Sequence, residues 1–139
     1  EKAANLAPNY VDAQVNLAMV AIYLGKKDIE ERVTAWIEEM FKVANDGHNQ
    51  YPKLINAYAA VKNYSKLAEY YGKLIVIKKE LLKVEDAEDH MNFAVSLAKI
   101  GKVDEAKKEI REAVRIDPNK YGQEEEKLIK YLDSGQPLP

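Results

Sequence analysis

The feature that most constrains this sequence is a helical spacing of apolar residues that is interrupted at a few regularly placed turns. In the segment 87–119, apolar residues recur every three or four positions on both sides of Gly101. This spacing places them on one face of a helix. Glycine tolerates the left-handed backbone that closes a helix, and Pro118 ends the second apolar stretch. The segment therefore predicts two amphipathic helices joined by a tight turn.

The same layout occurs twice more upstream, in a less regular form. Apolar helical stretches lie on both sides of Gly25 and of Lys62, which we interpret as the corresponding turns. The interval is 37 residues from 25 to 62 and 39 residues from 62 to 101. We predict an all-α fold, closed by a further helix over 123–132 that turns glutamates outward.

Composition excludes several classes of function. The 139-residue chain has a net charge of −2, whereas a nucleic-acid-binding domain carries a basic face. It has no cysteine, which excludes disulfides and thiolate metal sites. No apolar run approaches the roughly 20 residues that span a bilayer. We expect neither nucleic-acid binding nor direct membrane insertion.

The sequence also lacks the groupings of residues that catalysis or cofactor binding requires. His48 and His90 fall in different hairpins and lack the spacing of paired metal ligands. The six glycines are dispersed, so they form no phosphate-binding loop. The acidic pair Glu38 and Glu39 falls on a helix, where consecutive residues do not share a face. We therefore expect no enzyme activity and no catalytic, cofactor-binding or metal-binding residues.

Segment 87–119 resembles the tetratricopeptide repeat, a helical hairpin of about 34 residues with small residues where its helices cross. Phe93 and Ala94 occupy the site of the family's paired leucine and glycine, and Gly101 lies at its inter-helix turn. His90 stands where the family has tryptophan, which departs from the pattern. The remaining pattern positions are filled by Leu97, Ala106, Ile110, Ala113 and Pro118.

The resemblance implies a right-handed superhelix of antiparallel helix hairpins, with about three repeat units and a C-terminal capping helix. The intervals of 37 and 39 residues are longer than the family's consensus of about 34, so the second helices or their exits should carry insertions. The implied divisions are 1–8 (remnant of a preceding repeat), 9–47, 48–84 and 85–119 (units 1 to 3), 120–133 (capping helix) and 134–139 (tail). Because the chain opens within such a remnant and without an initiator methionine, we expect it to be a fragment of a larger protein.

In the tetratricopeptide family, the first helix of each hairpin lines a concave groove that binds peptides. Carried over to this sequence, the groove is expected to accept an apolar peptide segment or helix. The expected groove residues include Asp12, Val15, Met19, Ile22 and Tyr23 in unit 1, Asn56 in unit 2, and Met91, Val95 and Lys99 in unit 3. Family members that dock a chaperone's C-terminal carboxylate use basic residues there, whereas Glu88 would repel such a group.

The sequence therefore favours a non-catalytic protein–protein interaction scaffold whose partner is a protein or peptide. A first alternative is an accessory domain in bacterial surface polysaccharide assembly. The repeats, short capping helix and proline-containing tail are similar in style to the C-terminal region of O-antigen ligase or polymerase-type membrane proteins. A second is a structural oligomerisation element, with a homodimer through the apolar N-terminal edge. The expected compartment is cytoplasmic by default and bacterial membrane-associated under the first alternative.

Overall fold

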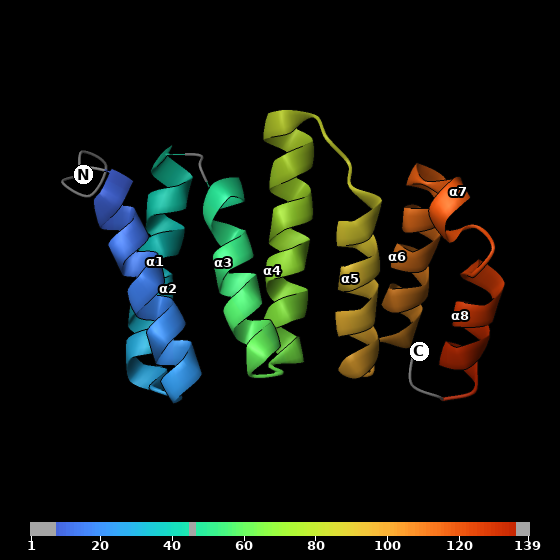
Figure 1. Cartoon of the computed structure of the whole chain (residues 1–139), viewed down its shortest axis with the longest axis horizontal. Coiled ribbons are helices and arrows are strands. Elements are labelled where there is room, and N and C mark those ends of the chain that lie inside the picture. The colour runs from blue at the N-terminus through green and yellow to red at the C-terminus, as the bar shows by residue number, and fades with distance from the viewer. Residues whose placement is uncertain (1–7, 45–46, 136–139) are drawn as a thin grey trace. The chain divides into compact units, whose positions relative to one another are not determined.

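The computed structural model describes the backbone of residues 8–44 and 47–135 and the side chains of residues 10–42 and 49–135. Within those ranges every regular element is a helix, as the sequence predicted (Figure 1). The elements are α1 (Pro8–Leu24), α2 (Lys27–Ala44), α3 (Gly47–Ala60), α4 (Tyr64–Ile77), the π-helix η2 (Lys78–Leu82), α5 (Ala87–Lys99), α6 (Val103–Ile116), α7 (Pro118–Tyr121) and α8 (Glu125–Asp133). The predicted remnant at 1–7 and the tail at 136–139 lie outside the described residues.

The chain divides into two compact units at the turn between α3 and α4. Unit 1 is Glu1–Asn63 and unit 2 is Tyr64–Pro139. This division falls between the two helices of the predicted second repeat at 48–84. Each unit is therefore described by itself.

In unit 1, α1 packs against both α2 and α3. Val15, Ile37 and Leu54 have no exposed surface and form the centre of this packing. One buried polar contact fixes α3 on α2: the Tyr58 hydroxyl donates to Glu30 Oε2 at 2.7 Å. A buried carboxylate is costly unless it accepts a hydrogen bond, so this contact also specifies how α3 lies on α2.

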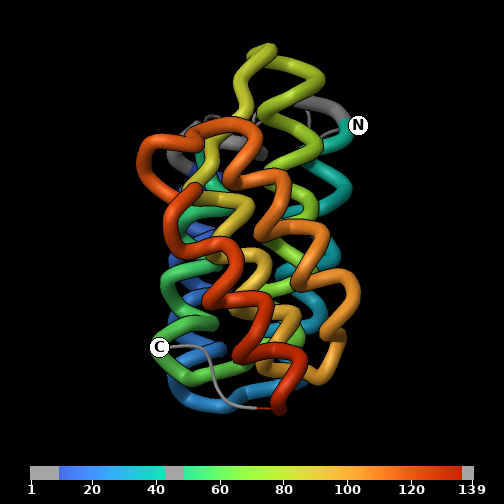
Figure 2. The backbone as a smooth tube through the Cα atoms, turned by 90° about the vertical axis from the view of Figure 1, so that its right-hand side faces the viewer, coloured from blue at the N-terminus to red at the C-terminus, as the bar shows by residue number. Residues whose placement is uncertain are grey.

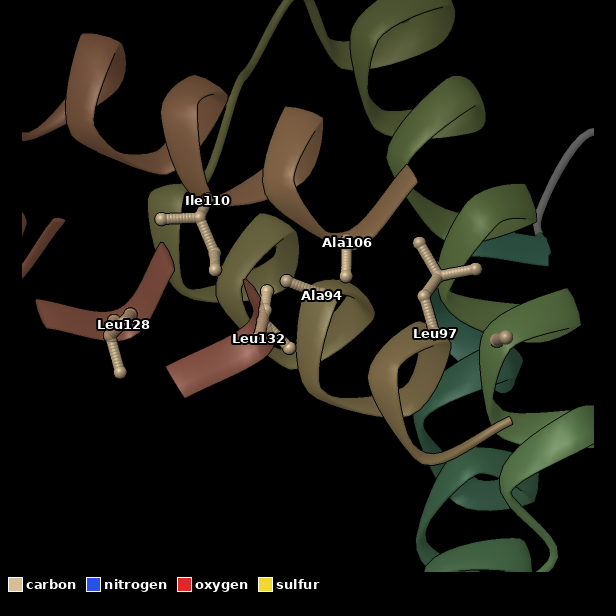
Figure 3. Packing of buried hydrophobic residues seen from close by; sticks show 7 residues of the cluster. Ala94, Leu97, Ala106, Ile110, Leu128 and Leu132 are labelled. Carbon is tan, nitrogen blue, oxygen red and sulfur yellow. The ribbon is translucent and has the colours of Figure 1, made fainter. Parts of the chain in front are cut away.

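In unit 2, α5 packs between α4 and α6, and α8 covers α6. The buried cluster includes Ala94 on α5 and Ala106 on α6, and neither has exposed surface. Figure 3 shows both methyl groups where the two helices cross, with Leu128 and Leu132 of α8 beside them. Small residues at the crossing let the backbones approach, which is the role that the sequence predicted for Ala106.

Each of the three hairpins turns through the same backbone motif. Residues 25, 62 and 101 adopt left-handed φ values of 71°, 58° and 84°. The N–H of the next residue donates to the carbonyl five residues earlier, at 2.9 Å in all three cases, and this is the Schellman closure of a helix. The second helix then begins at residue 27, 64 or 103. The predicted turns at Gly25, Lys62 and Gly101 are thus confirmed.

The long interval between the second and third turns is explained by η2. Five residues in π-helical conformation extend α4, and Lys83 then closes the helix in the left-handed region at φ 57°. Figures 1 and 2 show this end of α4 reaching beyond the start of α5. The expected insertion therefore lies at the exit of a second helix, as an extra turn.

The C-terminal cap differs in detail from the single helix predicted over 120–133. A short helix, α7, begins at Pro118, because the side chain of Asp117 accepts a hydrogen bond from the Lys120 N–H at its start. The longer helix α8 follows from Glu125 and buries Leu128 and Leu132. Among the described residues, no helix has both the length and the apolar character needed to cross a membrane.

Replacing Lys62 by glycine should raise the free energy of unfolding by about 0.5–1 kcal/mol. Lysine is strained at φ 58°, whereas glycine is not. Urea unfolding followed by circular dichroism measures the change. Lys26→Gly is the matched control, because Lys26 follows Gly25 without a left-handed φ and glycine there should only destabilise. A Lys62→Gly protein less stable than the parent would contradict this account of the turn.

Replacing Ala106 by tryptophan should destabilise unit 2 by roughly 3 kcal/mol, because the crossing of α5 and α6 has no room for an indole. Thermal unfolding followed by circular dichroism measures the loss. Glu105→Trp, on the exposed side of the same turn, should unfold within a degree or two of the parent. Equal losses in the two variants would show that the crossing is not close-packed.

Candidate functional site

The turn residue of each hairpin provides a common register for the three first helices, α1, α3 and α5. Four positions, at 13, 9, 6 and 2 residues before the turn, hold side chains that are exposed or half-buried in all three helices. We call these positions the first-helix stripe. It comprises Asp12, Asn16, Met19 and Tyr23 on α1, Asn49, Lys53, Asn56 and Ala60 on α3, and Glu88, Asn92, Val95 and Lys99 on α5.

In unit 1 the stripes of α1 and α3 lie side by side. Gln50 Nε2 donates to Asp12 Oδ1 at 2.8 Å, and Lys53 Nζ lies 3.7 Å from the same oxygen. Gln50 Oε1 is buried, so Asp12 and Lys53, whose side chains are partly exposed, supply the polar groups that reach the surface. The two helices thus present one continuous surface that can accept and donate hydrogen bonds.

Two of the expected groove residues do not reach this surface. Val15 is 0 % exposed and Ile22 is 4 % exposed in the packing of α1 with α2 and α3. They are core residues, and the prediction that they contact a ligand is wrong. Asp12, Met19, Tyr23 and Asn56 keep exposed surface. The surface of unit 1 is therefore more polar than the sequence led us to expect.

In unit 2 the expected residues divide in a similar way. Met91 is half-buried against the core cluster around Ala94 and Leu128. Val95 is half-buried and Lys99 is exposed, with its ammonium 5.6 Å from the centre of the Tyr64 ring. Cation–π contact of this kind orients the lysine without covering it.

Asparagine is the residue that recurs on the first-helix stripe. Its amide donates and accepts hydrogen bonds, so it can pair with both groups of a peptide backbone. The Asn92 side chain hydrogen-bonds Tyr71 of α4, which lowers the Tyr71 pKa, but burial and the charges of Asp89 and Glu88 outweigh it and leave that pKa raised. The stripe asparagines are Asn16, Asn49, Asn56 and Asn92. Asn16 was not among the groove residues expected from the sequence, although counting nine residues back from Gly25 reaches it.

A second cluster of polar side chains lies at the start of α5, next to η2. Lys78 Nζ is 2.6 Å from Asp89 Oδ2 and 3.7 Å from Asp86 Oδ2, while His90 Nδ1 is 2.6 Å from Glu109 Oε1. A cavity of about 80 Å³ adjoins these side chains. These contacts join Lys78 of η2 and Glu109 of α6 to side chains of α5, so they fasten both elements to that helix.

The charge of Lys78 is stabilised despite its burial. Burial alone would lower the Lys78 pKa, but the hydrogen bond and the charge of Asp89, followed by Asp86, raise it above the usual lysine value. The contribution of this pair to stability is therefore fully present at neutral pH. The part that comes from the Lys78 charge is lost as the pH rises through the raised pKa.

Replacing Lys78 by methionine should lower the free energy of unfolding by about 2 kcal/mol, because Asp89 would be left as a largely buried, unpaired carboxylate. Chemical unfolding at pH 7 measures the loss. Adding Asp89→Asn should restore at least half of it, since the remaining group is then neutral. Lys79→Met, on the exposed neighbour, should have almost no effect. Similar losses at Lys78 and Lys79 would contradict the role given to the pair.

The residues that the structure describes contain no grouping of histidine, aspartate and glutamate side chains suited to a metal ion. The side chain of His48 lies outside the described set. Comparison of the chain with protein-family models, with curated proteins and with solved structures finds no match to any of them. The first-helix stripe, taken within each unit by itself, is therefore the candidate site on the strength of its own residues.

Proposed function

We propose that this chain is a non-catalytic protein-interaction scaffold of the tetratricopeptide type, which binds an extended peptide along its first-helix stripe. The hairpins would stack as a right-handed superhelix, with the stripes of successive first helices following its concave side. This arrangement is the one expected from the resemblance to that family. It makes α1, α3 and α5 equivalent elements, each of which carries the same binding positions.

The observation that carries the proposal is the recurrence of asparagine at equivalent stripe positions. Asn16 and Asn92 both lie nine residues before a turn, on α1 and α5, and Lys53 holds that position on α3. Asn49 and Asn56 flank Lys53 on the same face of α3. Asn49 and Asn56 are two helical turns apart with Lys53 between them, and each amide can pair with both the donor and the acceptor of a peptide backbone. Asparagine also has a low helix propensity, so its repeated use in helices points to a role for its amide.

The apolar members of the stripe supply the second part of the recognition. Met19 and Tyr23 stand one helical turn apart on α1, beside the amides, and Val95 takes the Met19 position on α5. Methionine adapts to differently shaped partners, and tyrosine combines an apolar ring with a hydroxyl. Backbone pairing with a few apolar contacts favours an extended peptide bearing spaced apolar side chains over a wholly apolar helix.

The test is to select peptides from a random display library against the whole chain and to measure their affinities by titration calorimetry. Removing both amides, in Asn16→Ala with Asn56→Ala, should weaken binding about 25-fold, at roughly 1 kcal/mol for each lost hydrogen bond. The melting temperature of the double variant should equal that of the parent, because both side chains are exposed.

The matched control is Asn119→Ala, which removes an exposed amide from α7, outside the stripe. It should leave the affinity unchanged. A library that yields no specific peptide would refute the proposal. So would peptides that tolerate loss of the stripe amides as well as they tolerate loss of Asn119.

A further inference from the structure

A surface cavity of about 340 Å³ lies at one end of unit 2, where α5 begins and α6 gives way to α7. Figure 1 shows the start of α5 and the short helix α7 at the same end of this unit. Ligand pockets in proteins cover roughly 300–1,000 Å³, so this cavity is among the small ones. Its size suits one long side chain of a partner better than a whole cofactor.

Part of the cavity wall is apolar. Val84, Ala87 and Ile116 line it together with Tyr121. Val84 is 46 % exposed whereas Ala87 is buried, so the apolar surface extends from the open rim inward. The methylene stem of a lysine or arginine packs on a surface of this kind while its charged head stays near water.

The rest of the wall is mostly acidic. Among the described residues that line the cavity, one is a cation, Lys120, and four are carboxylates: Glu85, Asp86, Glu88 and Asp117. Three of these carboxylates have partners. Glu85 pairs with Arg115 at 3.0 Å, Asp86 accepts a hydrogen bond at the start of α5, and Asp117 accepts one at the start of α7.

Glu88 is the carboxylate that remains. Its side chain is exposed, and within the described part of the chain it makes no hydrogen bond and no ion pair. Lys120 interacts with it at longer range: the pKa of Lys120 is raised first by Tyr121, and then by the charges of Glu88 and Asp117. The carboxylates at this end of unit 2 therefore stabilise a cation, and Glu88 can pair with a second one.

Glu88 also belongs to the first-helix stripe, so the cavity adjoins the stripe at the start of α5. From Glu88 the stripe continues along α5 through Asn92 and Val95 to Lys99. Glu88 and Val95 are seven residues apart, which is roughly 10 Å along a helix and about three residues of an extended peptide. A peptide that contacts Val95 can thus place a side chain in the cavity about three positions further on.

We propose that the cavity binds a lysine or arginine side chain of the peptide on the α5 stripe, with the stem on the apolar wall and the charged head at Glu88. This inference rests on the proposed function and names the class of peptide. The partner is an extended segment with a basic residue about three positions from an apolar one. Acidic segments are disfavoured, because the carboxylates of the cavity repel them.

The cavity can be tested without any peptide. The isotope-labelled whole chain is titrated with N-acetyl-arginine amide and followed by two-dimensional NMR, with N-acetyl-citrulline amide as a neutral probe of the same shape. The arginine probe should shift the backbone signals of residues 84–88 and 116–121, with a dissociation constant on the order of 1 mM. The citrulline probe should shift them much less, and added salt should weaken the arginine response.

Glu88→Gln removes the charge but keeps the size of the side chain, and it should weaken binding of the arginine probe about threefold to fivefold. Glu126→Gln is the matched control, because Glu126 is an exposed glutamate of α8 outside the cavity. It should leave the binding unchanged. Circular dichroism shows whether both variants are folded. If Glu88→Gln does not fold, the comparison of the two probes on the parent chain decides the question.

Peptides selected on the whole chain provide the second test. They should carry lysine or arginine about three positions from an apolar residue. Replacing that basic residue by citrulline should weaken binding about as much as Glu88→Gln does. The two changes together should cost little more than either one alone, because both remove the same contact.

Equal shifts with the two probes, or arginine shifts that Glu88→Gln leaves unchanged, would overturn the inference. Peptides that bind the stripe without a basic residue would also overturn it, while the proposed function would stand. A library without binders, combined with arginine-specific shifts, would refute the proposed function and leave the cavity as a site for a basic side chain.

Discussion

The hydrogen bond that closes each first helix determines the positions of most other residues in this protein. The bond runs from the residue after the turn to the carbonyl five residues earlier, and it requires a left-handed residue at 25, 62 or 101. It fixes both the last residue of the first helix and the start of the second, two positions after the turn. Core, crossing and stripe positions can then be counted from a single residue. At the second turn Lys62 stands where the other two turns have glycine. It adopts the same left-handed conformation, at a cost in backbone strain.

Much of this was predictable because it is local. Gly25 and Gly101 end helices by their own chemistry, Lys62 follows from the spacing, and Ala106 and Ile110 occupy one face of one helix. Val15 and Ile22 were misplaced because their burial depends on α3, which packs across them. The helical periodicity of α1 alone cannot separate a face covered by a neighbour from one left open, since α1 is apolar all round.

The Lys78 cluster was not predictable for a different reason. Lys78 and Asp89 are eleven residues apart, a spacing that brings side chains together in no regular element. They meet because η2 continues the helix by an extra turn and the chain doubles back through Lys83. A π-helix inserts a residue into the helical register, so its surroundings cannot be derived by counting in steps of 3.6. The salt bridge between Lys78 and Asp89 then fastens the extra turn to α5.

The first helices show how one element can serve two purposes in a repeat. Helices α1 and α5 each have a face that packs on the second helix of their own hairpin, a face on the side where a preceding hairpin would lie, and a third that carries the stripe. On α5 the second face is covered by α4 and its extension η2. Phe93 lies beside Gly72 of α4, and Asp89 pairs with Lys78 of η2. On α1 the same face is open, yet it carries Leu17 and Val20 and no charge. Leucine and valine on a helix with a single charged residue are typical of a surface that another element covers. The composition of α1 is therefore that of a covered helix, on a face that the structure leaves open.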